Sequence, residues 1–345
     1  IGFAVRSYST SSRPISFDLP RPNTLAVQEF VPGNIIYANG GRYKTSYYHL
    51  PLDRGQTSPD KFMVDVNKQS IYEINETPTD YRSDDVKELG AIPIGDVELA
   101  FISLVSDEEE GRFRMPVFMT GHLRNEHRGI DRYRTGLTVR KEFEHRHGQR
   151  VRLVNIGAAD QVKDKNLGYP ICAVCGAVRS PYASDETIKD FEKKHKVSCS
   201  VAPSRLGLYT ESQVDGLLFS GLVSLDEAIN LTEGIRIAAA VLLEMEVEDL
   251  QIIILPNMDG MFDVMLYDPM PGGSGLIDQI IERWSEIIET GSRVLQNCPG
   301  NCAKACYDCM KTYRNMVDHE KLDRGLAVKM LNEFKGTVEK IGSVP

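Results

Sequence analysis

Alternating apolar and polar positions in the first half of the chain predict short β-strands. Residues 34–37 and 42–48 flank residues 39–41, an Asn-Gly-Gly turn whose residues tolerate a positive φ, so a β-hairpin is expected there. Further apolar runs at residues 97–105 and 115–120 predict two more strands. Together these segments predict a small antiparallel sheet or barrel in the N-terminal part of the chain.

From about residue 205 onward the pattern changes, and helices alternate with apolar strands. Ser224 and Glu227 have the spacing of a capping box, which predicts the start of a long helix that ends near Met245. Other elements expected in this part are strands at residues 214–222, 251–255 and 261–267, a hairpin connection at residues 256–260, and an amphipathic helix at residues 276–290.

All seven cysteines fall into two tight clusters with spacings typical of metal sites. The first cluster has a CxxC motif followed, after nineteen residues, by HxxxC, and the second cluster has the motif CxxxCxxxCxxC. Each therefore offers four ligands of the kinds that bind tetrahedral zinc. On one unbroken helix Cys298 and Cys309 would be about 16 Å apart, but a shared ion needs its sulfurs within roughly 4 Å of each other. The second segment must therefore fold back, and Pro299 and Gly300 are expected to break the helix there. The predicted ligands of two zinc ions are Cys172, Cys175, His195, Cys199, Cys298, Cys302, Cys306 and Cys309.

Other interpretations of the cysteines stay open at this point. Disulfides are the main alternative, although seven is an odd number and no secretory signal is visible; iron–sulfur chemistry, or zinc at the second cluster alone, are the others. His195 is the weakest ligand, because it follows the polar run 190–194 and could be an ordinary surface histidine, with His319 or water in its place. Sites with four protein ligands leave no position for a catalytic water, so the metals are expected to be structural.

Length and composition indicate an ordinary globular protein of two or three domains, with 345 residues, 41% of them hydrophobic and 26% charged. No apolar run reaches the length of a membrane span, so no membrane partner and a cytoplasmic location are expected. The first residue is Ile1, which suggests one piece of a longer polypeptide. We predict an α+β fold with four consecutive parts: a linker or domain tail at residues 1–22, a β-rich domain at 23–155, a zinc-knuckle segment at 156–204, and a C-terminal mixed α/β domain with the four-cysteine zinc site at 205–345.

Charge is distributed unevenly along the chain, although the net charge of −9 argues against indiscriminate coating of nucleic acid. Residues 73–110 hold twelve acidic and two basic side chains, whereas residues 112–152 hold eleven basic and four acidic ones together with aromatic side chains and four histidines. The basic stretch could contact a phosphate backbone, or it could be a solvated face or pair internally with the acidic run. The candidate DNA contacts are Arg124, Arg128, Arg132, Arg134, Arg140 and Lys141.

Motifs across residues 150–335 resemble the MrfA-type zinc-binding domain, a C-terminal domain of superfamily 2 DNA helicases and of DISARM phage-defence proteins. The specific part is the four-cysteine block with the tail that follows it. The motifs are Val154–Gly157, Gly168–Gly176, Asp215–Leu218, Tyr267 and Asp268, Gly272–Gly275, Cys298–Cys309, Tyr313–Asn315, His319 and Leu322–Arg324. Residues 20–60, with Phe30–Gly33 and Tyr37–Gly40, are similar to the β-rich segment before this domain. The resemblance implies a module that holds or guides DNA beside a helicase in DNA repair or antiviral defence.

The expected function is therefore a non-motor, zinc-stabilised accessory module that helps engage or guide DNA for a helicase motor, which lies upstream in the same polypeptide or on a partner. The chain has no GxxxxGK[ST] motif, and we expect it to have no catalytic activity of its own. The main alternative is a protein-interaction scaffold that docks on the motor without touching DNA. A minor one is a degenerate phospholipase-D-like nuclease, because His319 and Lys321 match an HxK motif, but Leu326 stands where that motif needs an acid.

Overall fold

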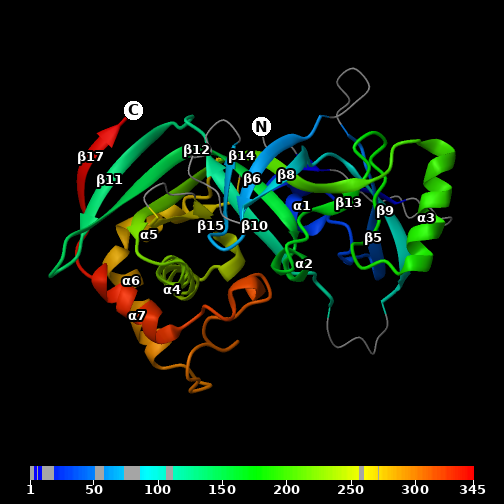
Figure 1. Ribbon diagram of the computed structural model, residues 1–345. Helices are drawn as coiled ribbons and strands as arrows, with labels where there is room; N and C mark the ends of the chain where they lie inside the picture. The colour runs from blue at the N-terminus through cyan, green and yellow to red at the C-terminus, as the bar shows by residue number, and fades with distance from the viewer. Residues whose placement is uncertain are drawn as a thin grey trace. The chain divides into compact units, whose positions relative to one another are not determined.

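The chain forms two compact units, each built from segments that are distant in the sequence (Figure 1). The computed structural model describes residues 4–5, 7–9, 19–50, 58–73, 86–105, 112–255, 260–270 and 272–345. The first unit comprises residues 1–67, 71–120 and 152–211, and the second comprises residues 68–70, 121–151 and 212–345. Most of the predicted linker at residues 1–22, and the acidic residues 107–110, lie outside the described residues.

A four-stranded sheet in the first unit has the order β2–β9–β5–β4. Its strands are β2 (Ser7–Ser9), β4 (Ile36–Ala38), β5 (Gly41–Tyr48) and β9 (Val97–Leu104). β4 and β5 form the predicted hairpin, and Asn39 and Gly40 between them have φ values of 47° and 72°, as the two-residue turn requires. The sheet is not wholly antiparallel as predicted, because β2 pairs with β9 in the parallel direction.

The rest of the first unit supports the segment that contains the first cysteine cluster. In a second set of strands β14 pairs with β8 in parallel, β8 pairs with β6, and β13 pairs with β14. The hydroxyl of the buried Tyr48 donates to the Phe30 carbonyl at 2.6 Å, which ties the first helix to the hairpin. The elements are β1 (Ala4–Val5), β3 (Arg21–Pro22), α1 (Asn23–Glu29), β6 (Asp60–Asp65), β7 (Ser70–Glu73), β8 (Val86–Pro93), α2 (Ala159–Lys163), β13 (Tyr169–Ile171) and α3 (Asp185–Ser198).

The second unit contains a sheet built around two long strands, β12 (Lys141–Ala158) and β14 (Ser204–Leu222). β17 (Glu339–Val344), β11 (Gly129–Thr135), β12 and β14 are neighbours in that order, and β16 (Phe262–Asp268) lies between β14 and β15 (Gln251–Leu255). The predicted strands at 214–222, 251–255 and 261–267 are confirmed, although β14 begins ten residues before its predicted start, at Ser204. The predicted strand at 115–120 is observed as β10 (Val117–Leu123).

Helices α4 (Leu225–Leu243), α5 (Leu276–Glu282), α6 (Trp284–Gln296) and α7 (Arg324–Glu333) form the helical part of the second unit. α4 packs against α6 and α7, and an aromatic cluster joins the helices to the sheet: the ring centroids of Phe143 on β12 and Trp284 on α6 are 4.5 Å apart. The single helix predicted at 276–290 is in fact α5 and α6, separated at Arg283, whose side chain donates to the Leu242 carbonyl at 3.3 Å.

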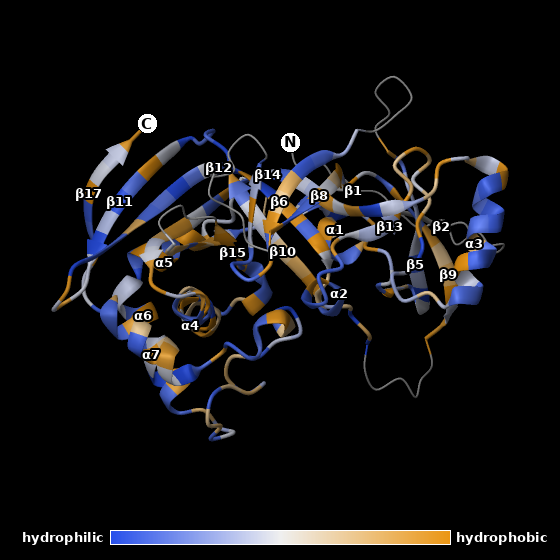
Figure 2. Ribbon diagram, viewed as in Figure 1, coloured by the Kyte–Doolittle hydropathy of each residue, from blue (hydrophilic) through white to orange (hydrophobic). Residues whose placement is uncertain are grey.

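α4 begins where the capping box predicts. The Ser224 hydroxyl accepts from the Glu227 backbone N–H at 3.1 Å, and the Glu227 carboxylate accepts from the Val223 N–H at 3.3 Å. Figure 2 shows α4 as largely hydrophobic and α3 as largely hydrophilic. Within the described ranges, no helix combines the length and the apolar character needed to cross a membrane.

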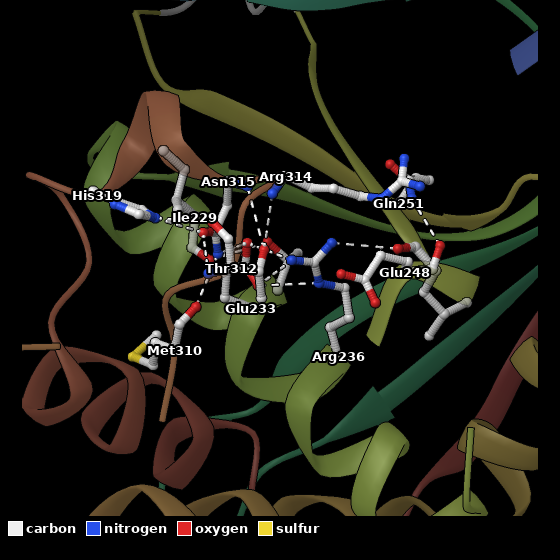
Figure 3. A network of polar contacts seen from close by, with 12 residues as sticks. Ile229, Glu233, Arg236, Glu248, Gln251, Met310, Thr312, Arg314, Asn315 and His319 are labelled. Atoms are coloured by element: carbon white, nitrogen blue, oxygen red, sulfur yellow. Dashed lines mark hydrogen bonds and ion pairs between the residues drawn. The ribbon is translucent and has the colours of Figure 1, made fainter. Parts of the chain in front are cut away.

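A buried polar network joins α4 to the segment after the second cysteine cluster (Figure 3). Arg236 and Glu233 form an ion pair of 2.7 Å with side chains only 4% and 3% exposed. The Asn315 amide donates to Glu233 at 2.9 Å and to the Met310 carbonyl at 2.9 Å, while its oxygen accepts from the Thr312 N–H at 2.8 Å. Burial raises the pKa of Glu233, and the charge of Arg236 and the Asn315 hydrogen bond oppose that rise. Asn315 therefore fixes residues 310–315 on α4.

We expect Glu233→Ala to destabilise the second unit strongly. The substitution leaves the Arg236 guanidinium buried without its carboxylate and removes an acceptor of Asn315, which should cost about 3–5 kcal/mol in the free energy of unfolding. Urea denaturation followed by circular dichroism measures this loss. Glu286→Ala is the matched control, because Glu286 forms the same type of (i, i+3) pair with Arg283 on the surface of α6. Equal midpoints for the two variants would show that the buried pair is not a structural anchor.

Candidate metal centres

The four cysteines of the second cluster come together in the turn that follows α6. The chain reverses directly after Cys298, where the Asn301 N–H donates to the Cys298 carbonyl at 3.0 Å, so the predicted break at Pro299 and Gly300 is observed. A second reversal brings Cys309 back, because the N–H groups of Met310 and Lys311 both donate to the Cys306 carbonyl, at 3.0 and 2.9 Å. The ligand atoms of all four cysteines lie within 4.8 Å of one another.

The distances between the sulfurs fit a shared metal ion and not a disulfide. Sγ–Sγ separations are 3.8 Å for Cys298–Cys302, 3.5 Å for Cys298–Cys306, 3.7 Å for Cys302–Cys309 and 3.8 Å for Cys306–Cys309. Two sulfurs that are each about 2.3 Å from one tetrahedral ion lie about 3.8 Å apart, whereas a disulfide joins them at about 2.05 Å. All seven cysteines are free thiols, so the disulfide alternative is wrong.

Side chains from the family motifs hold the second cluster in place. Arg324, the first residue of α7, donates to the Cys302 carbonyl at 2.9 Å and to the Leu295 carbonyl at 3.0 Å. His319 Nε2 lies 3.0 Å from the Thr312 carbonyl, and its ring meets Tyr307 edge-on at 5.6 Å. His319 therefore packs beside the cysteine turn.

The first cluster joins a tight turn after β13 to the end of α3. Cys172 and Cys175 lie on the turn, which closes with a hydrogen bond of 2.9 Å from the Gly176 N–H to the Cys172 carbonyl. Gly176 has a φ of +81°, and a Cβ there would come 1.9 Å from the Tyr48 carbonyl oxygen, so only glycine fits. Cys199 is the C-cap residue directly after α3, and its N–H donates to the His195 carbonyl at 2.8 Å.

His195 takes part in the first cluster and is not an ordinary surface histidine. It is the buried residue of α3, and its ring stacks on Phe191 with centroids 5.5 Å apart. His195 Nε2 lies 3.2 Å from Cys175 Sγ, while Cys172 Sγ lies 3.7 Å from Cys199 Sγ. The four ligand atoms fall within 4.8 Å of one another, so small shifts would bring them to the separation of about 3.8 Å that a tetrahedral ion requires.

The crowded thiols differ in pKa within each cluster, because the pKa is lowered for Cys172 and Cys298 and raised for Cys175 and Cys309. Burial, reinforced by the nearby thiols of Cys172 and Cys199, raises the pKa of Cys175 to about 12. Burial and the neighbouring Cys302 likewise raise the pKa of Cys309 to about 12. A cation is what allows several thiolates to occupy one small volume, so the donor sets fit a thiophilic metal ion.

The candidate DNA contacts on β11 are paired with carboxylates on the neighbouring strand. Arg132 lies 3.3 Å from Glu144, and Arg134 lies 2.8 Å from Glu142, in each case directly opposite in the register of β11 and β12. These four side chains share the outward face of the β11–β12 ribbon. The alternate positions, which face the other way, carry the core residue Phe143 and Tyr133 directly opposite it. The ribbon face therefore alternates in charge and is not a purely basic strip.

The other four candidates lie around the same ribbon. Lys141 pairs with Glu333 at 2.8 Å, and Arg128 lies 3.5 Å from Asp215. Arg140 donates to the Gly136 carbonyl at 3.2 Å in the loop between β11 and β12, and Arg124 lies in the segment between β10 and β11. Among the described residues, the carboxylates paired with Arg128, Arg132, Arg134 and Lys141 belong to Asp215, Glu144, Glu142 and Glu333. Arg152, at the end of the basic stretch, does pair with the acidic run, because it lies 3.2 Å from Glu73.

A third cluster of possible ligands, which sequence patterns did not single out, lies on the inward face of the ribbon. Asp131 is directly opposite His145, and His147 lies two positions further along the same face. Burial, with a smaller effect of His147, lowers the pKa of His145 to about 4, so this imidazole is neutral at pH 7. Burial alone would raise the pKa of Asp131, but hydrogen bonds from Lys340, Ser343 and His147 lower it to about 2. In the sequence, the HxH spacing of His145 and His147 was the one signal for this cluster. Asp131 can be added only from the register of β11 and β12.

Solved structures to which the chain is similar include those of one helicase. They are crystal structures of the DUF1998 helicase MrfA alone (12% identity, TM-score 0.40), bound to DNA (11%, 0.39), and bound to DNA and AMPPNP (11%, 0.32). The matches cover 92%, 96% and 95% of this chain but 33%, 34% and 31% of the helicase chains, so the chain spans about a third of their length. No curated protein matches the chain.

The family of the MrfA Zn-binding domain matches residues 231–310. This range begins within α4, includes the hairpin of β15 and β16 and the helices α5 and α6, and contains all four cysteines of the second cluster. The first cluster, at residues 172–199, lies outside it. The resemblance to the MrfA zinc-binding domain that the sequence motifs predicted is thus confirmed over residues 231–310.

Proposed function

We propose that this chain is a non-motor, zinc-stabilised accessory module of a superfamily 2 DNA helicase or of a phage-defence complex. The observation that carries the proposal is the second cysteine cluster, which has the geometry of a metal site and lies inside the match to the MrfA Zn-binding domain. The motor is a separate subunit or an upstream part of the same polypeptide. The module supplies a rigid surface beside that motor and has no chemical step of its own.

Two zinc ions are proposed as structural cofactors. Cys298, Cys302, Cys306 and Cys309 hold one, and Cys172, Cys175, His195 and Cys199 hold the other. Bound zinc would supply a cross-link between chain segments, because four protein ligands leave no position for a reacting water. In the first cluster the link runs from the turn after β13 to the end of α3, and in the second it closes the turn between α6 and α7.

DNA engagement is proposed for the outward face of the β11–β12 ribbon and the loops around it. Arg132 and Arg134 are about half exposed there, at 55% and 41% of their side-chain area, and Glu142 is 55% exposed, whereas Glu144 is 23% exposed and also pairs with Arg146 at 2.7 Å. Exposed ion pairs of this kind are worth at most about 1 kcal/mol. A phosphate could therefore take the place of Glu142 at little cost, and binding would gain the release of the phosphate's counterions.

The same ion pairs support a second candidate, a scaffold that docks on the motor without DNA contact. At least four of the six candidate cations pair with carboxylates in the described part of the chain, so the ribbon carries less unbalanced positive charge than its sequence suggests. A ribbon of alternating charge is a surface that a protein partner of complementary pattern can recognise. The two candidate functions differ in the role of Glu142 and Glu144. In a DNA-binding module these carboxylates compete with DNA for the arginines, whereas in a scaffold they are part of the protein interface.

Natively purified protein is expected to contain two equivalents of zinc per chain after a wash with a mild chelator. Cys306→Ser and Cys175→Ser should each reduce the zinc content to about one equivalent, because each removes one ligand of a different site. Inductively coupled plasma mass spectrometry measures the metal. Cys306→Ser should also expose the turn after α6 to proteolysis, since binding energy at a structural site is folding energy. Iron in place of zinc, or full zinc content in both variants, would contradict the assignment.

Charge changes on the ribbon should alter DNA affinity in both directions. Arg132→Glu with Arg134→Glu should weaken binding to any DNA sequence and flatten the salt dependence by roughly one unit per lost phosphate contact. Glu142→Gln with Glu144→Gln should strengthen binding, because the arginines lose their competing carboxylates. Fluorescence-anisotropy titrations with short duplex and single-stranded DNA measure both effects.

Matched controls for these variants come from ion pairs in the first unit. Lys61→Glu with Lys194→Glu removes two paired surface cations, and Glu88→Gln with Asp190→Asn removes their partners. These two double variants change the net charge by the same amounts as the ribbon variants and should leave DNA affinity nearly unchanged. Equal effects at the ribbon and at the controls would reject the DNA proposal in favour of the scaffold.

A further inference from the structure

We propose that Asp131, His145 and His147 form a third cation site, which takes a divalent first-row transition metal such as Zn²⁺. The site lies on the inward face of the β11–β12 ribbon in the second unit and is separate from both cysteine clusters. Its donors are two imidazole nitrogens and a carboxylate oxygen, a set that suits zinc and its neighbours more than calcium or magnesium.

The strand register places the three donors together. Asp131 on β11 is directly opposite His145 on β12, and Gly129 is opposite His147, so no side chain separates His147 from Asp131. The two imidazole rings have centroids 3.8 Å apart, and the ligand atoms of all three residues lie within 4.8 Å of one another. His147 Nε2 is 3.2 Å from Asp131 Oδ2. Two such atoms that are each about 2.1 Å from a tetrahedral ion lie about 3.4 Å apart, so this separation needs little adjustment.

His145 provides a second observation that points to a ligand. The residue is only 1% exposed, and its Nε2 atom is buried without a hydrogen-bond partner in the described part of the chain. Buried polar atoms in proteins are nearly always paired, and an orphan costs stability. The other ring nitrogen, Nδ1, lies 3.8 Å from the carboxylate of Asp278. One nitrogen facing a carboxylate while the other coordinates is the usual arrangement of a metal-binding histidine.

Lys340 competes with the metal at this site. Its Nζ lies 2.8 Å from Asp131 Oδ2, while the Ser343 hydroxyl donates to Asp131 Oδ1 at 2.7 Å. The Lys340 side chain is 49% exposed on β17, so it can move into solvent when a cation takes Oδ2. Asp278 is 64% exposed and lies close enough to His145 to shield the charge of the cation. The site therefore exchanges a lysine for a metal without a change in the core.

Calorimetric titration of the full chain with Zn²⁺ tests the proposal, with protein whose cysteine-bound metal has been measured beforehand. One further equivalent should bind per chain. His147→Gln should weaken that binding at least about tenfold, since loss of even an outer partner of a ligand costs 10–100-fold. Lys340→Met should strengthen it, because the competing ammonium is gone. His147 is only partly buried, so this variant should fold, and a thermal melt without added metal checks that it does.

His49→Gln is the matched control, because His49 pairs with Glu98 at 3.3 Å on the surface of the first unit and offers an ordinary histidine–carboxylate pair. It should leave the additional equivalent intact. No additional equivalent, or one that survives in His147→Gln, would overturn the proposal. Unchanged affinity in Lys340→Met would also overturn it, because Asp131 Oδ2 would then not be a ligand. The cysteine sites do not enter these comparisons, so failure here leaves the proposed function untouched.

Discussion

The closeness of four sulfurs after α6 is the constraint on which the end of the second unit depends. Sγ atoms 3.5–3.8 Å apart cannot be reached along a straight helix, so the chain must reverse after Cys298 and again after Cys306. The reversals leave carbonyl groups that need donors, and Arg324 supplies them for Cys302 and Leu295. The start of α7 is thereby tied to the end of α6, and the cysteine turn becomes part of the helical packing.

The buried pair of Glu233 and Arg236 on α4 has a related role for residues 310–315, which follow the cysteine turn. A buried ion pair is weak evidence for stability by itself, because desolvation offsets much of the attraction. Here the carboxylate also accepts from Asn315, whose other bonds fix Met310 and Thr312. Two groups with fixed geometry, the cysteine turn and this network, thus hold the segment between Cys309 and α7 against α4. The Tyr-Arg-Asn motif of the tail gains a physical role through Asn315.

The β11–β12 ribbon presents different chemistry on its two faces, as the alternation of strand side chains requires. Outward positions carry Arg132 and Arg134 beside their glutamates, and inward positions carry the aromatic contact of Tyr133 and Phe143 followed by the Asp131 and histidine cluster. A basic segment in the sequence is therefore both a charged surface and part of an interior. The proposal of DNA contact concerns the first face, and the proposal of a third cation concerns the second.

The sequence by itself determined the features that depend on neighbours along the chain: the turn at Asn39 and Gly40, the start of α4 at Ser224, and the cysteine spacings, because turns, caps and ligand loops involve residues a few positions apart. Only the tertiary structure decided which carboxylates pair with the basic stretch, that His195 joins the first cluster, and that Asp131 lies beside His147. Each depends on strand register or helix placement between distant segments, which composition and periodicity do not specify. The division into four consecutive parts stays a prediction. The two compact units are built from separate segments of the chain, and β12 and β14 each contribute to both units.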